Sequence, residues 1–126
     1  MRSQGSKAPA EKGETIMNRA EAFHRAKAKN LKTLALYVPI VDRVHGEHHP
    51  EFHQVRALAE SIITKAKAVR TRLPALDEEF AQLRQVTNNY LVPDDVCESY
   101  EAVYQMLSEM DRAYTGSGGT PCYAGY

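Results

Sequence analysis

Apolar residues recur every three or four positions along most of this chain, which is the spacing of one face of an α-helix. The two longest runs cover residues 52–73 and 96–114, and a shorter run covers 76–90. No stretch alternates apolar and polar residues in the way that a half-buried β-strand requires. The pattern therefore predicts an all-α protein.

Three prolines predict where helices begin, because acidic residues follow each of them within one turn. Proline in the first turn is tolerated, and acids there interact favourably with the helix dipole. These prolines are Pro50, Pro74 and Pro93, and Gly46 and Gly116 suit C-cap positions. The predicted helices span residues 16–45, 50–72, 75–90 and 94–114. Four amphipathic helices joined by short turns are typical of an up-down-up-down four-helix bundle.

The length of 126 residues indicates a single domain. Residues 1–15 lack the apolar segment of a secretory signal, and we interpret them as a flexible leader. Residues 16–115 form the predicted bundle. Residues 116–126 differ in composition from the helix before them and are predicted to be an irregular tail.

The first predicted helix is unusual in two respects. Pro39 lies inside it, which predicts a kink or break between Ala35 and Pro39. At about 1.5 Å per residue the helix would reach roughly 45 Å, against about 25 Å for the third helix. Some of its apolar length would then lack a partner within the chain. A homo-oligomer, most simply a dimer, is the expected way to cover it.

Charge and cysteine content narrow the class of protein. The chain has 16 basic and 16 acidic residues, which gives no electrostatic basis for binding nucleic acid or an anionic membrane surface. No apolar run is long enough to cross a bilayer. Two cysteines, Cys97 and Cys122, do not make a disulfide framework. We therefore expect a cytoplasmic protein with reduced thiols, and we interpret Cys97 as a packing residue beside Val96.

Histidines are concentrated in one stretch, RVHGEHHPEFHQV, which holds all but one of the five in the chain. One interpretation is a solvated junction between two helices. The alternative is a weak Zn²⁺, Ni²⁺ or Cu²⁺ site formed by imidazole and carboxylate ligands. Its candidate ligands are His45, His49 and His53 with Glu47 or Glu51.

The same stretch, read as VDRVHGEHHPEF, resembles a helix junction in the di-iron iron–sulfur cluster repair proteins, a hemerythrin-like family. The segment LRQVTNNYLVPDDVCESYEAVYQML resembles the connection between the third and fourth helices of that family. The resemblance covers roughly residues 20–114 in the same order. It implies a four-helix bundle with non-haem iron, a role in cluster repair under nitrosative or oxidative stress, and an iron–sulfur protein as client.

The resemblance places family metal ligands on only two histidines of this chain, His24 and His45. These are separated by 21 residues, or about 30 Å along an unbroken helix, so one ion cannot bind both. The remaining His-x-x-x-Glu positions hold Thr64, Ala68, Ser117 and Pro121. Both bridging carboxylates are thus absent, and the resemblance implies an incomplete iron site.

Two classes of function follow from these observations. The first is a hemerythrin-like protein related to iron–sulfur cluster repair, with an incomplete metal site. The alternative is a metal-free helical interaction module or homo-oligomeric structural protein. The chain shows no nucleophile–base–acid arrangement, phosphate loop or paired-carboxylate site, so we do not expect an enzyme. The tyrosines are expected in the core and at its rim: Tyr37, Tyr90, Tyr100, Tyr104 and Tyr114.

Overall fold

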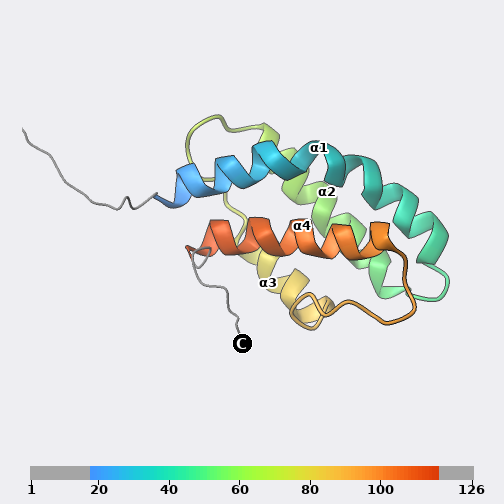
Figure 1. Cartoon of the computed structure of the whole chain (residues 1–126). Coiled ribbons are helices and arrows are strands. Elements are labelled where there is room, and N and C mark those ends of the chain that lie inside the picture. The colour runs from blue at the N-terminus through green and yellow to red at the C-terminus, as the bar shows by residue number, and fades with distance from the viewer. Residues whose placement is uncertain (1–17, 117–126) are drawn as a thin grey trace, which may run out of the picture.

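The computed structural model describes residues 18–116, and these fold into helices joined by turns (Figure 1). The four helices are α1 (Arg19–His45), α2 (Glu51–Lys67), α3 (Asp77–Val86) and α4 (Glu98–Thr115). No strand occurs within this range. The prediction of an all-α protein with four helices is confirmed. The predicted leader, residues 1–15, and tail residues 117–126 lie outside the described residues.

α1 is one continuous helix. It begins at Arg19 instead of residue 16 because Asn18 has extended backbone and caps the helix; its side-chain oxygen accepts the Glu21 N–H at 2.8 Å. Pro39 lies within the helix and does not end it, so the predicted break is absent. Figure 1 shows that the ribbon of α1 bends over its second half, as a missing backbone hydrogen bond favours.

Two of the three prolines that were predicted to mark helix starts do not lie at the start of a helix. Pro50 is the N-cap of α2 and does begin that helix. Pro74 and Pro93 instead lie in the connections that precede α3 and α4. Gly116 has a φ of 87° and ends α4 with a left-handed residue, as a glycine C-cap does.

α2 ends at Lys67, short of the predicted residue 72. Side chains of α1 bind backbone carbonyl groups at and beyond this end. The Lys27 ammonium donates to the Ala66 carbonyl oxygen at 2.8 Å, and His24 Nε2–H donates to that of Arg72 at 2.8 Å. Because Lys27 satisfies a carbonyl group that a longer helix would bind itself, the chain can leave the helix here.

α3 ends at Val86 instead of residue 90, and α4 begins at Glu98 instead of residue 94. α3 ends early because three consecutive residues, Asn88, Asn89 and Tyr90, have left-handed backbone, with φ angles of 54°, 60° and 64°. A right-handed helix cannot pass through them. Asparagine tolerates this conformation better than most residues, but tyrosine does not, so the turn is strained.

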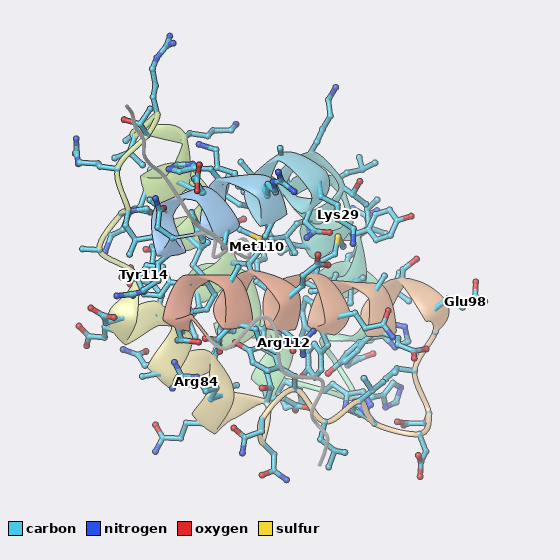
Figure 2. The ribbon with its side chains drawn as sticks, turned by 60° about the vertical axis from the view of Figure 1, so that its left-hand side comes forward. Lys29, Arg84, Glu98, Met110, Arg112 and Tyr114 are labelled. Atoms are coloured by element: carbon cyan, nitrogen blue, oxygen red, sulfur yellow. The ribbon has the colours of Figure 1, made fainter. Side chains whose placement is uncertain are left out.

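α1 packs most extensively against α4 and then against α2, while α3 packs against α2. α1 and α4 run antiparallel, because Arg19 Nε donates to the Tyr114 carbonyl oxygen at one end and His45 contacts Cys97 at the other. Figure 2 shows Lys29 on one side of α4 and Arg84 on the other. The up-down-up-down order of the whole bundle stays a prediction.

The core draws on all four helices, as the apolar periodicity predicted. Its largest fully buried side chains are Tyr100, Tyr104, Phe23, Phe52, Phe80, Leu34, Ile62, Leu76, Leu83, Leu107, Met110 and Val38. Tyr114 is also buried, whereas Tyr37 and Tyr90 pack against the core from its rim. The tyrosines therefore serve packing. No helix within residues 18–116 is long and apolar enough to span a membrane.

An ion pair between α2 and α3 joins these two helices. Glu79 is buried and accepts hydrogen bonds from Lys65 Nζ at 2.6 Å and from the Ser61 hydroxyl at 2.8 Å. Burial alone would raise the pKa of the Glu79 carboxyl, but the bonds from Lys65 and Ser61 outweigh it and hold the pKa below its ordinary value of 4.5.

Acid is expected to weaken this link. Because the pKa of Glu79 is lower in the folded chain than in the unfolded chain, its contribution to stability is present above 4.5 and is lost as the pH falls below that value. Thermal midpoints measured by circular dichroism between about pH 5 and about pH 3 are expected to fall less steeply in Glu79→Gln than in the wild type. Glu78→Gln, at an exposed neighbouring position, is the control and keeps the wild-type slope. Equal slopes in Glu79→Gln and the wild type would contradict this account.

Candidate functional site

The histidine-rich stretch forms the turn between α1 and α2. Gly46 is the C-cap of α1, and its N–H donates to the Asp42 carbonyl oxygen at 2.8 Å. The φ of Gly46 is −61°, so this glycine is not required for left-handed backbone. A Cβ here would lie 2.7 Å from His53 Cε1 and would also overlap the Asp42 carbonyl oxygen. Glycine therefore allows the first turn of α2 to approach the end of α1.

His45 and His49 point toward the beginning of α4. Their ring centroids are 6.5 Å apart, and each ring stands edge-on to the buried ring of Tyr100, at 5.4 Å for His45 and 5.6 Å for His49. Two of the predicted ligands thus lie at one end of the bundle, and both contact the same tyrosine.

His49 is held by a carboxylate on each side. Its Nδ1 is 3.1 Å from Glu51 Oε2 and its Nε2 is 3.0 Å from Asp95 Oδ1. Burial of the ring lowers the pKa of His49, but the hydrogen bonds and charges of Glu51 and Asp95 raise it by more, so the pKa lies above its ordinary value. The ring therefore links the turn after α1 to the connection before α4.

The other predicted ligands lie elsewhere. His53 is exposed and its Nδ1 is 2.6 Å from Asp42 Oδ1, on the α1–α2 contact. Glu47 is exposed in the turn. His24 lies near the opposite end of α1 from His45, with its Nε2 on the Arg72 carbonyl oxygen. Within residues 18–116 no three His, Cys, Asp or Glu side chains lie close enough to hold a metal ion.

Cys97 contacts His45, which the sequence did not predict. The cysteine is exposed at the N-cap position of α4, so its interpretation as a packing residue is wrong. Its Sγ is 3.2 Å from His45 Nε2. The two residues are 52 positions apart in sequence, and only the antiparallel pairing of α1 with α4 brings them together. The sequence held one signal for this contact, a cysteine near a predicted helix start and a histidine at a predicted helix end.

A row of apolar side chains faces outward on the second half of α1. Leu36, Ile40 and Val44 are 61%, 41% and 60% exposed, and their spacing of four residues places them along one face of the helix. We call these three residues the outer stripe. The inward face of the same segment is formed by Val38 and Val41, which are buried.

Asp111 of α4 binds both α3 and the turn Asn88–Tyr90, which we call the strained turn. Its Oδ2 accepts from Arg84 Nε at 2.8 Å and from the Tyr90 hydroxyl at 2.8 Å, while only 5% of Asp111 is exposed. Burial raises the pKa of the Tyr90 hydroxyl, and the charge of Asp111 raises it further, so this hydroxyl remains a donor.

A hollow of about 190 Å³ lies beside this network. Its walls are the strained turn and one face of α4. The lining side chains are Asn89, Tyr90, Tyr104, Gln105, Ser108 and Arg112.

Comparison with known proteins found no family model that matches the chain and no solved structure that matches it significantly. The resemblance to hemerythrin-like repair proteins thus depends on the two sequence segments described above.

Proposed function

We propose that this protein is a helical interaction module that associates with a second copy of itself through the outer stripe of α1. The observation that carries the proposal is the exposure of Leu36, Ile40 and Val44 in one row. Contiguous apolar side chains on a protein surface mark interaction sites, because removing apolar area from water is favourable by about 25 cal/mol per Å².

The charges next to the outer stripe favour an antiparallel pair. Lys32 continues the row at its N-terminal end, and Glu47 follows its C-terminal end; both are exposed. A two-fold axis near Ile40 would pack Leu36 against Val44 of the second copy, and it would bring Lys32 close to Glu47 of that copy. A parallel pair would instead place like charges together.

The expected result is a dimer that depends on the outer stripe. In analytical ultracentrifugation, Leu36→Lys is expected to weaken self-association at least about tenfold, because burying a leucine is worth about 1.5–3 kcal/mol. Leu91→Lys is the matched control, since Leu91 is 64% exposed but lies outside α1. A monomeric wild type at high micromolar concentration, or an unchanged dimer in Leu36→Lys, would contradict the proposal.

A charge exchange tests the orientation of the pair. Lys32→Glu alone is expected to weaken the dimer, since two acids would then face each other at each end. Adding Glu47→Lys restores the opposite charges and the association in an antiparallel pair. Failure of the double variant to recover would count against this orientation but not against the use of the outer stripe.

Iron–sulfur cluster repair, with an iron–sulfur protein as client, is the second candidate function. One observation favours it: the two segments that carry the resemblance meet in space, where His45 contacts Cys97 and His49 contacts Asp95. Iron analysis of the untagged protein distinguishes the two candidates. Two equivalents of iron per chain with an oxo-bridge absorption band would favour cluster repair, whereas a dimer without iron would favour the interaction module.

A further inference from the structure

We propose that the end of α2 and the connection that follows it bind a short acidic segment of a partner protein. The cationic side chains that hold this segment are Lys67, Arg70 and Arg72, which we call the basic edge. This surface lies beside the first half of α1, whereas the outer stripe lies on the second half. The proposal therefore does not depend on self-association.

The charges of this neutral chain are segregated in the fold. Residues 19–41 and 61–76 carry nine basic side chains and one acidic side chain, whereas the other described residues carry four basic and 13 acidic ones. The two basic segments lie side by side, because Lys27 Nζ donates to the Ala66 and Val69 carbonyl oxygens at 2.8 and 3.1 Å. Figure 1 shows the connection between α2 and α3 beside the first half of α1. The overall balance of charge thus conceals a positive surface.

The charges of the basic edge lack counter-charges. Lys65 pairs with Glu79 at 2.6 Å. The three side chains of the basic edge are exposed, and none of them has an acidic partner within ion-pair distance among residues 18–116. Neighbouring members are roughly 7–10 Å apart along an extended chain, which is close to the Debye length of about 8 Å at physiological salt. Their potentials therefore add, and an acidic ligand would supply the missing counter-charge.

The connection is fixed to α1 through its carbonyl groups. Lys27 binds that of Val69, and His24 Nε2–H donates to that of Arg72 at 2.8 Å. The backbone N–H groups of residues 69–73, in contrast, donate to no other group in the described part of the chain. These N–H groups can add donors for a carboxylate to those of the two guanidinium groups. Because α1 already orders the backbone, binding costs less conformational entropy than it would at a free loop.

Two arginines within three residues suit a carboxylate ligand, because a guanidinium group can donate two parallel hydrogen bonds to one carboxylate. Arginine clusters are a common means of recognising acidic motifs in proteins. The positive surface is also short. α3 begins directly after the connection, and its exposed acids Asp77 and Glu78 bound the basic edge on that side. The ligand is therefore a segment of a few acidic residues.

Nucleic acid fits this surface less well. It is a long polyanion, and the acidic remainder of the described chain would repel the part that extends beyond the basic edge. Single strands also bind through stacking on aromatic side chains, and no Phe or Tyr among residues 18–116 is classed as exposed. Charge and the absence of stacking groups in this range both favour an acidic protein segment.

Fluorescence anisotropy of a labelled oligoglutamate peptide, titrated with the full chain, tests the proposal. Saturable binding with a dissociation constant of about 100 μM or lower is expected at about 50 mM salt. Raising the salt to about 150 mM is expected to weaken binding at least about threefold, because the charges are exposed and screened. A labelled oligoglutamine peptide is the neutral control and is expected not to bind.

Matched double variants locate the binding surface. Arg70→Gln with Arg72→Gln is expected to weaken binding of the oligoglutamate at least about tenfold. Arg43→Gln with Arg56→Gln removes the same charge near the turn between α1 and α2 and is expected to keep the wild-type affinity. Circular dichroism establishes that each variant is folded. Lys67→Gln alone is expected to weaken binding about threefold and tests the same surface if the first double variant does not fold.

Three results would overturn the proposal. The first is no saturation by oligoglutamate at about 50 mM salt. The second is an equal loss of affinity in both double variants, or wild-type affinity in a folded Arg70→Gln with Arg72→Gln and in Lys67→Gln. The third is tighter binding of a labelled DNA duplex of about 20 base pairs that is lost in the same double variant, since the basic edge would then be assigned to nucleic acid.

Discussion

Replacing Phe52 with alanine is expected to lower the free energy of unfolding by about 3–5 kcal/mol, the largest effect of any single substitution proposed for this chain. Phe52 is fully buried at the start of α2. Its ring centroid lies 4.9 Å from that of Tyr100 and 6.4 Å from that of Tyr104, with the latter pair nearly parallel. Alanine would remove both contacts and leave a cavity where α2 meets α4.

Urea denaturation followed by circular dichroism measures this loss. Phe52→Leu retains most of the buried volume and is expected to cost about 1–1.5 kcal/mol. Leu91→Ala removes an apolar side chain that is 64% exposed, so its expected cost is within about 0.5 kcal/mol. A loss below about 1 kcal/mol in Phe52→Ala would show that the aromatic cluster does not stabilise the fold in this way.

The second large effect is expected for Asp111→Ala, at about 2–4 kcal/mol. The carboxylate accepts hydrogen bonds from Arg84 and Tyr90 and is almost fully buried. Alanine would leave the buried Tyr90 hydroxyl without its acceptor and Arg84 without its counter-charge. Because Arg84 is 40% exposed and can be hydrated, the expected cost stays below that of breaking a wholly buried ion pair.

A double-mutant cycle separates the two bonds of Asp111. Tyr90→Phe removes the hydroxyl alone and is expected to cost about 1 kcal/mol in the wild type and less in the Asp111→Ala background. Glu109→Gln is the control on the same helix, because its ion pair with Lys29 is largely exposed and is worth about 0.2–1 kcal/mol. Additive losses in the cycle would show that Tyr90 and Asp111 do not act together.

Apolar periodicity predicted much of the buried core, but not where each helix ends. Val69 is buried as its place in the second apolar run predicts, yet it lies beyond the end of α2. The backbone leaves the helix there, and side chains from a distant part of the chain bind its carbonyl groups. Lys27 donates a hydrogen bond to the Val69 carbonyl oxygen, and His24 donates one to that of Arg72. Such long-range donors cannot be recognised from local sequence.

The candidate site was harder to predict than the fold for a related reason. His45, His49 and His53 are close in sequence, which suggested a common site. In the structure His49, in the turn, faces Asp95, whereas His53, one turn later in α2, faces Asp42 of α1. Proximity along the chain does not determine where side chains converge at a helix junction.

The pairing of α1 with α4 has a consequence for how the chain is made. These are the first and last of the described helices, and each covers the apolar face of the other. While the ribosome is still synthesising α4, the buried face of α1, including Phe23 and Leu34, has no cover from that helix. Folding of the described domain therefore waits until Thr115 has left the exit tunnel, and during that interval α1 is the segment that a chaperone would bind.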